Sequence, residues 1–314
     1  MRNEMSSQND DVAILLCTYN GECFLEEQLN SFEKQVNDWR LFVSDDHSNF
    51  QTLSILKQFQ KKHSAKKIMI QSGPQRGFAA NFLSLTCSTC IQASYYAFSD
   101  QDDVWEPNKL SKAIAWLQTI PSDCPALFCS SIRLIDSQGN EIGFSKIFKR
   151  QPHFSNALVE NIATGHTMVF NQAARELLLK AGSDIRIPAH DWWLYLVVSA
   201  CGGKIYYDSY PSVRYRQHKN NVTGYDMSLI GLIKRAIHMF IFNHFKLKID
   251  MNIHALERIY PYMTTSNQIV FENFKQARHH RLIRRIFKTH QSGIYRQTLI
   301  GNIGLVAAIL TNKI

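Results

Sequence analysis

Short apolar runs alternate with helical patterns along the first two thirds of the chain, and no other feature restricts the fold so strongly. Val12 to Leu16, Leu41 to Val43 and Tyr95 to Phe98 each have the length of a buried strand. Between the first two runs, residues 25–36 carry apolar side chains at helical spacing. This alternation predicts an α/β fold, in which helices cover a mainly parallel sheet and sites lie at the carboxyl ends of the strands.

The same pattern continues along the chain and becomes less regular after Gly165. It predicts further strands at Lys67 to Gln71, Ala126 to Ile135, His166 to Phe170 and Lys204 to Tyr207, and helices at Phe78 to Ala93, Ala173 to Lys180 and His190 to Ala200. Asn20 is expected to cap the first helix, and Asp103 the helix that contains Pro107.

Length and composition restrict the class of protein. The 314 residues suffice for one large domain with an appendage, and 45% hydrophobic with 19% charged residues excludes a disordered chain. The seven cysteines are an odd number, and the polar start from Met1 to Asp11 has no secretory character, so a reduced, cytoplasmic protein is expected. No run reaches the roughly 20 apolar residues of a membrane-spanning helix.

Charge divides the chain into a neutral body, residues 1–224, and a basic helical tail, residues 225–314, which carries the whole net charge of +9. In the tail, four cations are expected on one helix face and four apolar residues on the other: Arg281, Arg284, Arg285 and Lys288 against Leu282, Ile283, Ile286 and Phe287. Such a helix suits the surface of an anionic membrane. A nucleic-acid-binding tail is the alternative, although the apolar face favours lipid or packing on the body.

An acidic cluster, Ser99-Asp100-Gln101-Asp102-Asp103, directly follows the fourth predicted strand. Carboxylates crowded at a sheet edge repel one another unless a positive charge lies between them. Mg²⁺ or Mn²⁺ bridging a diphosphate would supply that charge, with carboxylates of this cluster as ligands. Helix capping by these aspartates is the alternative.

A second acidic cluster, Ser44-Asp45-Asp46-His47, follows the second strand. One carboxylate there could accept a hydrogen bond from a pyrimidine base, and Thr18-Tyr19, at the end of the first strand, could supply a wall for the base. An Asx turn is the alternative. Neither a G-x-G-x-x-G nor a P-loop motif occurs, so these phosphate-binding loops are not predicted.

Two later segments also carry polar chemistry. Asp191 stands beside Trp192 and Trp193, where it could act as a general base next to a sugar, or could begin a helix whose aromatic residues are core. The segment Tyr215 to Lys219 gathers cations that could neutralise a departing diphosphate, or could be a solvated loop.

In this order, the segments resemble the bacterial rhamnosyltransferase-like branch of glycosyltransferase family 2. The resemblance covers about the first 224 residues, and its most specific parts are Phe98 to Trp105 and Tyr215 to His218. The other matching segments are Cys17 to Gly21, Phe24 to Leu29, Asp38-Trp39, Ser44 to Asp46, Gly77 to Phe82, Thr164-Gly165 and His190 to Trp193.

The resemblance implies a GT-A fold, a nucleotide-diphosphate sugar donor, a divalent metal and inversion at the anomeric carbon. Carried over to this chain, it implies that Asp191 is the catalytic base and that Asp102, with Asp100, holds the metal. The donor would meet Thr18, Tyr19, Asp46, Asp100, Arg216 and His218, and the acceptor and sugar pocket would contain Gly165, His166, Trp192 and Trp193.

Two residues depart from the family pattern. His47 stands where the family usually has glycine, which predicts an altered or strained turn, and His166 replaces a small residue beside the sugar pocket. The expected activity is transfer of one sugar, with L-rhamnose from dTDP-rhamnose as the first candidate, to a cell-surface polysaccharide or lipid-linked glycan at the inner membrane face. A UDP-hexose transferase and a non-catalytic sugar-nucleotide or nucleic-acid binder are the alternatives.

Overall fold

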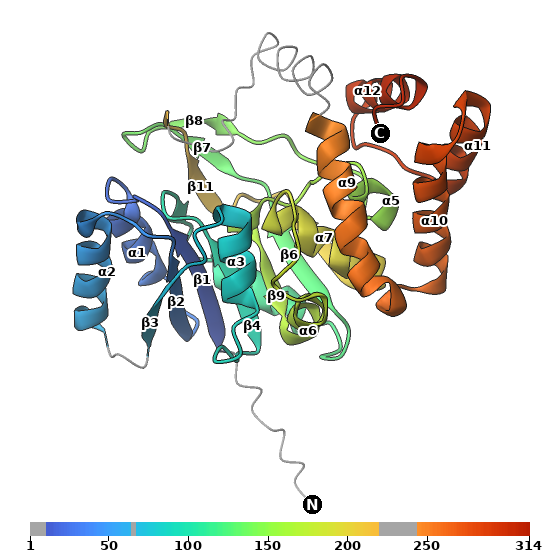
Figure 1. Cartoon of the computed structure of the whole chain (residues 1–314). Helices are drawn as coiled ribbons and strands as arrows, with labels where there is room; N and C mark the ends of the chain where they lie inside the picture. Colours follow the sequence, from blue (N-terminus) through green and yellow to red (C-terminus); the bar gives the residue numbers. More distant parts are fainter. Residues whose placement is uncertain (1–10, 64–66, 220–243) are drawn as a thin grey trace, which may run out of the picture.

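The computed structural model describes residues 11–63, 67–219 and 244–314, which form a layered α/β body with a helical region beside it (Figure 1). The main sheet has the strand order β10-β6-β9-β4-β1-β2-β3. All neighbouring strands are parallel except β9, which runs antiparallel to β4 and β6. The strands are β1 (Val12–Thr18), β2 (Trp39–Asp45), β3 (Ile68–Ser72), β4 (Tyr95–Ser99), β6 (Ala126–Ser130), β9 (Val169–Asn171) and β10 (Lys204–Asp208).

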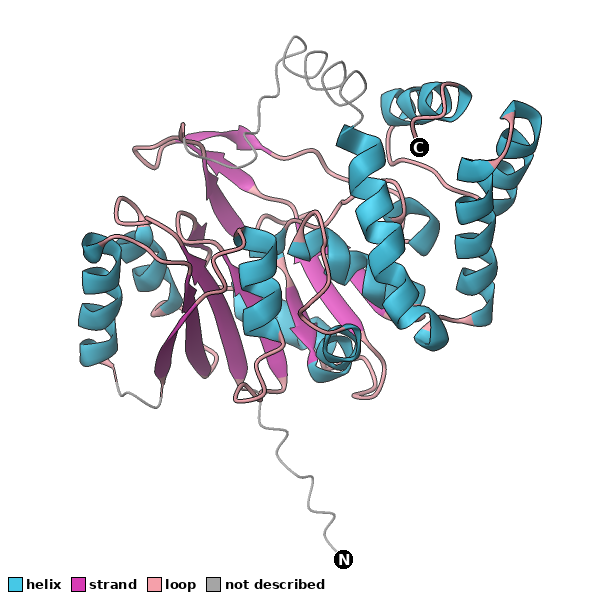
Figure 2. Ribbon diagram, in the orientation of Figure 1, coloured by secondary structure: helices cyan, strands magenta, loops and turns pink. Residues whose placement is uncertain are grey.

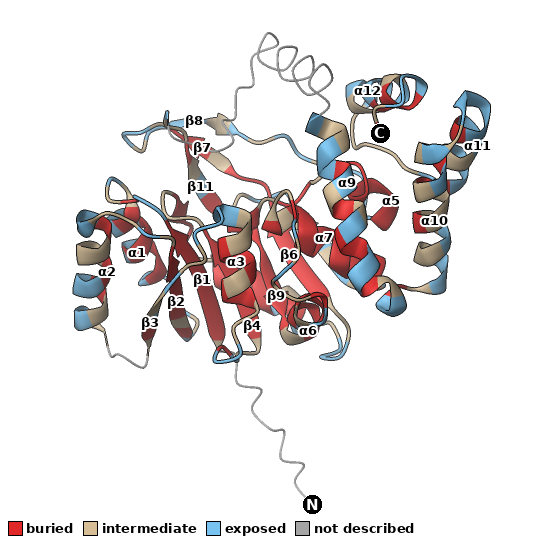
Figure 3. Ribbon diagram, viewed as in Figure 1, coloured by how far each residue is buried: buried red, intermediate tan, exposed pale blue. Residues whose placement is uncertain are grey.

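Both faces of this sheet are buried, which is why its central strand is apolar throughout. Ala13 and Leu15 on β1 enter one hydrophobic core, while Ile14 and Leu16 enter the other. Figure 2 shows the helices that cover the sheet, and Figure 3 shows the buried residues between the layers. One core includes residues of α3 (Phe78–Thr86), α6 (Gln172–Ala181) and α7 (His190–Ala200); the other includes residues of α1 (Leu25–Phe32), α2 (Phe50–Lys62) and α4 (Lys109–Leu117).

A second sheet, with the strand order β5-β11-β7-β8, continues beyond the first. The predicted single strand from Ala126 to Ile135 is wrong, because the chain leaves the main sheet after Ser130 and enters the second sheet at Arg133. The Ser131 hydroxyl donates to the Ser209 carbonyl at 2.6 Å, which holds the crossing in place. The strands of this sheet are β5 (Val104–Trp105), β7 (Arg133–Ile135), β8 (Glu141–Phe144) and β11 (Val213–Arg216).

Several element boundaries also differ from the predictions. Helix α3 ends at Thr86, and the predicted strand from residue 166 begins with the 3₁₀ turn η1 (Gly165–Thr167) before β9. Asn20 does not cap α1, because its side-chain oxygen accepts from the Asn49 backbone N–H instead. Asp103 does not cap α4, because β5 intervenes and its carboxylate accepts from the Arg216 backbone N–H at 3.2 Å.

The tail packs against the body. Buried residues of the tail, such as Ile249, Phe271 and Ile309, belong to the same core as α7. The predicted boundary at residue 224 lies outside the described residues. Within the described ranges, no helix combines the length and the hydrophobicity that crossing a bilayer requires. The helices here are α5 (Phe154–Ala157), α9 (His244–Leu256), η2 (Glu257–Tyr262), α10 (Thr265–His279), α11 (Leu282–Ser292) and α12 (Leu299–Leu310).

Candidate active site

The loops that follow β1, β2 and β4 meet at one edge of the main sheet. Leu16 on β1 pairs with Val43 on β2 and with Ser99 on β4, so the three strands end side by side. Gln101 joins two of the loops: the Tyr19 backbone N–H donates to its side-chain oxygen at 2.8 Å, and its amide donates to the Tyr19 carbonyl at 2.9 Å. The polar segments predicted at the ends of these strands therefore lie side by side.

The loop after β2 borders a cavity of about 280 Å³. Asp45 accepts from the Thr18 hydroxyl at 2.7 Å and from the Ser48 backbone N–H at 2.9 Å, while Asp46 accepts from the Gln75 backbone N–H at 2.5 Å. His47 has a φ of 73°, the left-handed conformation that glycine adopts readily and other residues rarely adopt, so of the two expected outcomes the structure has the strained turn and keeps a glycine-like backbone. The cavity is lined by Asp45, His47, Ser48, Leu53, Ile70, Gln71, Ser72 and Gln75.

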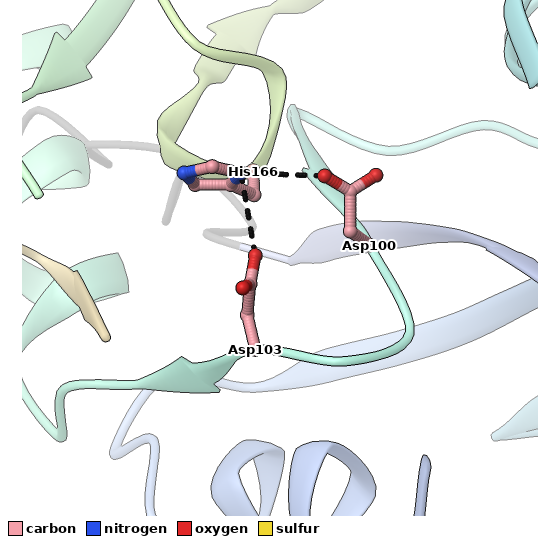
Figure 4. Close-up of side chains that lie close together, drawn as sticks. All are labelled: Asp100, Asp103 and His166. Atoms are coloured by element: carbon pink, nitrogen blue, oxygen red, sulfur yellow. Dashed lines mark hydrogen bonds and ion pairs between the residues drawn. The ribbon is translucent and has the colours of Figure 1, made fainter. Parts of the chain in front are cut away.

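Two aspartates of the acidic loop share one histidine (Figure 4). His166 Nδ1 lies 3.3 Å from Asp100 Oδ2 and 3.3 Å from Asp103 Oδ2, and these three groups are close enough together to hold one metal ion. Burial raises the pKa of Asp103 to about 8, although His166 acts in the opposite direction. Burial would lower the pKa of His166, but the charges of Asp103 and Asp100 outweigh it and raise that pKa above its usual value.

The third aspartate of the loop faces a different histidine. Asp102 Oδ2 lies 2.8 Å from His218 Nε2, which follows β11, and the His218 ring packs on Phe24 with ring centres 5.0 Å apart. Burial raises the pKa of Asp102, and the nearby Asp100 carboxylate raises it further. Carboxylate oxygens with an imidazole nitrogen are a donor set that suits Mn²⁺, so these residues fit a divalent metal.

Asp191 lies in the first turn of α7, where a helix favours negative charge. Its Oδ2 accepts from the Gly165 backbone N–H at 3.2 Å, and its Oδ1 accepts from the Trp192 backbone N–H at 2.6 Å. A Cβ atom on Gly165 would lie 2.5 Å from His190 Nε2, so only glycine allows the backbone at residue 165 to lie this close to the start of α7. Because His166 follows Gly165 directly, the turn η1 connects Asp191 with the acidic loop.

Comparison with known proteins identifies the family. The family model described as Glycosyl transferase family 2 matches residues 13–180, which is more than half of the chain. The chain belongs to glycosyl transferase family 2. This glycosyltransferase is 30% identical to the dTDP-rhamnosyl transferase RfbG of Shigella flexneri over 234 residues, which are 70% of this chain and 77% of that protein. It is also 32% identical, over 108 residues, to the putative glycosyltransferase EpsE of Bacillus subtilis, a match that covers 34% of this chain and 38% of that protein.

Solved structures agree on the fold of this family 2 glycosyltransferase. TarS of S. aureus (residues 1–349, in complex with UDP-GlcNAc) superimposes with a TM-score of 0.54 at 16% identity, covering 91% of this chain and 93% of that chain. The mannosyltransferase PcManGT of Pyrobaculum calidifontis, in complex with GDP-Man and Mn²⁺, gives a TM-score of 0.50 at 16% identity, covering 96% and 88%. These similarities establish the GT-A fold.

The two tryptophans beside Asp191 are not sugar-pocket walls in this glycosyltransferase, contrary to the prediction. Trp193 is completely buried, and Trp192 is 7% exposed, with its indole N–H donating to the Ala157 carbonyl at 2.7 Å. Helix α7 is apolar on nearly all sides and lies inside the protein, so both rings fill the core between α5 and the sheet. The alternative interpretation, in which Asp191 begins a helix whose aromatic residues are core, is correct for these two side chains.

Arg216 also differs from its predicted role of meeting the diphosphate directly. Its side chain is buried and donates to the backbone carbonyls of Asp102, Asp136 and Ser137 at 3.2–3.3 Å, and it also pairs with Glu27. The guanidinium thus holds the backbone of the acidic loop in place. His218, two residues later, reaches the Asp102 carboxylate.

The sequence patterns missed Lys109, a buried residue that holds the backbone of His166 in place. This lysine is buried, and its ammonium group donates to the His166 carbonyl at 2.6 Å and lies 3.3 Å from the centre of the Trp105 ring. Burial lowers the pKa of Lys109 well below its usual value, although Asp103 and Asp100 act in the opposite direction. Its position directly before Leu110, in the helix predicted to contain Pro107, was the signal that could have identified it.

Proposed function

We propose that this glycosyltransferase is an inverting, metal-dependent enzyme that transfers a sugar from a nucleotide-diphosphate donor to an acceptor hydroxyl. The observation that carries the proposal is the connection between Asp191 and the acidic loop through Gly165 and His166. This connection supports one cleft in which a proton acceptor and a group of metal-binding carboxylates face the same reacting carbon.

In the proposed reaction, Asp191 accepts the proton of the acceptor hydroxyl while that oxygen forms a bond to the anomeric carbon. The bond from this carbon to the diphosphate oxygen breaks at the same time, and its electron pair leaves with the diphosphate. Attack from the face opposite the leaving group inverts the carbon, so no covalent enzyme intermediate forms. The backbone N–H of Gly165 orients the Asp191 carboxylate for this role.

Asp102 and His218 are the residues proposed to hold Mn²⁺ or Mg²⁺, with Asp100 on the same loop. The metal, when bound, neutralises the charge that develops on the leaving diphosphate. The pyrimidine base is proposed to occupy the region of Thr18, Tyr19 and Asp46. The exposed ring of Tyr19 supports this position, as does the neighbouring 280 Å³ cavity.

The donor is proposed to be dTDP-rhamnose, because the relative from Shigella flexneri is described as a dTDP-rhamnosyl transferase. A UDP-linked hexose is the second candidate, since TarS has been determined with UDP-GlcNAc. The acceptor is proposed to be a cell-surface polysaccharide or lipid-linked precursor at the cytoplasmic face of the membrane, where this enzyme would work as a peripheral protein.

A thermal-shift screen tests the donor directly, because a ligand that binds the folded protein raises its melting temperature. We expect dTDP-rhamnose with Mn²⁺ to raise the melting temperature more than UDP-hexoses do, and Mn²⁺ to be required for the full effect. A larger effect of a UDP-sugar would replace the proposed donor. If no nucleotide sugar has any effect with either metal, the proposed activity is wrong.

A further inference from the structure

Helices α11 and α12 present large apolar side chains to solvent. Ile283 is 84% exposed and Leu299 79% exposed, and both belong to a set that shares this property. We call this set the apolar surface: Leu282, Ile283, Ile286 and Phe287 on α11, with Leu299, Ile300, Ile303, Val306 and Leu310 on α12. The two helices are in contact with each other, and large exposed apolar areas usually mark an interaction site.

The outward direction of these side chains follows from what α11 buries. Its inner stripe consists of Arg285, Thr289 and Ser292, which are polar. The Arg285 guanidinium donates to the Ile309 carbonyl of α12 at 3.0 Å and to the His280 carbonyl at 3.1 Å. The Arg285 side chain therefore ties α11 to α12, contrary to the prediction that it shares an outer cationic face with its neighbours.

Hydrogen bonds from the body also fix the orientation of α11 and α12. The Ser155 hydroxyl of α5 donates to the Ser292 carbonyl at 3.1 Å, and Glu160 accepts from the Gln297 backbone N–H at 2.6 Å. Helix α12 buries Leu305 and Ile309 in the core while its remaining apolar residues face outward. Because polar bonds fix both helices, the apolar surface cannot turn inward without breaking them.

Charge indicates what covers this surface. After Glu272 the sequence contains no acidic residue up to Ile314, while eight lysines and arginines occur there, three of which pair with earlier acids: Lys275 with Glu257, Arg278 with Asp250 and Arg296 with Glu160. Arg281 and Arg284 are exposed at the start of α11, next to Ile283. A second copy of this chain would bring one cationic helix pair against another, which like-charge repulsion opposes. An anionic lipid surface offers both opposite charge and an apolar interior.

We infer that the apolar surface of α11 and α12 docks this glycosyltransferase onto an anionic lipid bilayer, with its aliphatic side chains among the acyl chains and Arg281 and Arg284 at the headgroups. In Figure 1, α12 lies at the same end of the molecule as β7 and β8, the sheet next to the acidic loop. This inference rests on the proposed peripheral position at the membrane and names the surface that holds the enzyme there, and it can be tested without any turnover.

Flotation with vesicles tests the inference with the full chain. The probes are neutral vesicles of phosphatidylcholine alone and anionic vesicles in which about one lipid in three is phosphatidylglycerol. Both are used at low and at high salt. We expect the wild type to float with the anionic vesicles. The double variant Ile283→Glu/Phe287→Glu should bind at least about tenfold more weakly, because two apolar side chains no longer leave water. Arg281→Ala/Arg284→Ala should weaken binding chiefly at low salt.

A matched control separates docking from a general effect of added charge. Val36 is 82% exposed and Phe50 is 80% exposed, and both lie on the body, so Val36→Glu/Phe50→Glu places the same two new charges away from the tail. This variant should float like the wild type, and circular dichroism should show that all variants fold. Equal flotation of wild type and Ile283→Glu/Phe287→Glu would overturn the inference. So would a dimer, seen by light scattering, that this double variant abolishes.

Failure of the proposed activity can be distinguished from failure of the proposed docking. Donor hydrolysis measured in solution without lipid should be the same for the wild type and for Ile283→Glu/Phe287→Glu, since neither residue belongs to the candidate site. A wild type that floats but never hydrolyses or transfers a sugar would leave the docking in place and contradict the proposed function.

Discussion

The Gly165 backbone N–H donates to Asp191 Oδ2 at 3.2 Å, and this bond connects two segments that are 26 residues apart in the sequence. The next residue, His166, contacts Asp100 and Asp103. The proposed base and the acidic loop therefore both contact the same short turn, η1. A substitution at Asp191 tests the proposed proton transfer, while a substitution at Asp102 tests the proposed metal binding.

Replacing Asp191 with asparagine should remove the proton acceptor while keeping an oxygen for the Gly165 N–H. We expect the turnover number to fall by about 10²–10⁴-fold, the usual contribution of a general base, with little change in the donor-induced melting shift. Product formation under saturating donor and acceptor is the measurement. Asp184→Asn, at an exposed aspartate that pairs with Arg258, is the matched control and should retain full activity.

Asp102→Asn should weaken metal binding. Loss of one carboxylate from the pair with His218 is expected to raise the Mn²⁺ concentration needed for half of the donor-induced melting shift by roughly tenfold or more. A Mn²⁺ titration at fixed nucleotide concentration measures it. Glu141→Gln, at an exposed position of β8, provides the control. An unchanged Mn²⁺ requirement in Asp102→Asn would show that this carboxylate is not a ligand.

The position of the acidic clusters was predictable, but their partners were not. Because the run from Tyr95 to Phe98 is apolar and short, the sequence places Asp100 and Asp102 at the end of a buried strand. The neighbours of these aspartates come from distant segments: His166 reaches Asp100 through the turn η1, and His218 reaches Asp102 from the end of β11. Hydropathy patterns carry no information about such pairings.

Side-chain direction was the other limit of sequence reasoning. A tryptophan beside a candidate base suits a sugar or a core equally well, and only the burial of α7 decides for the core at Trp192 and Trp193. The same holds for the tail, where helical spacing predicted an amphipathic α11 but not that Arg285 faces inward. Amphipathic spacing gives two faces, and tertiary contacts decide which of them is buried.

Arg216→Met should destabilise the protein, because it removes the side chain that supports the acidic loop. The carbonyls of Asp102 and Asp136 lose a donor, and a buried acceptor left unpaired costs about 1–3 kcal/mol. We expect the free energy of unfolding in urea to fall by at least about 2 kcal/mol. Glu27→Gln removes the half-exposed partner of the same arginine and should cost less than about 1 kcal/mol. Equal stability of Arg216→Met and wild type would contradict the supporting role.

His190 should make the protein sensitive to mild acid. Its imidazole is buried and stacks on Phe82 with ring centres 3.8 Å apart. Burial lowers the pKa of His190, and the carboxylates of Asp191 and Asp100 offset this only in part. The unfolded chain, with an imidazole pKa of about 6.5, therefore binds a proton in a range where the folded protein does not. Stability is lost as the pH falls below the pKa of the unfolded state, with a slope of at most about 1.4 kcal/mol per pH unit from this group.

Comparison of His190→Asn with the wild type isolates this contribution. The variant is expected to be less stable at pH 7.5, because it loses ring packing on Phe82, but its free energy of unfolding should fall less between pH 7.5 and pH 5.5. Urea denaturation at both pH values gives the two differences. His254→Asn, which removes an exposed histidine from α9, should show the same loss over this range as the wild type. If His190→Asn loses as much stability as the wild type does on acidification, the imidazole of His190 takes up its proton in the folded protein over the same pH range as in the unfolded chain.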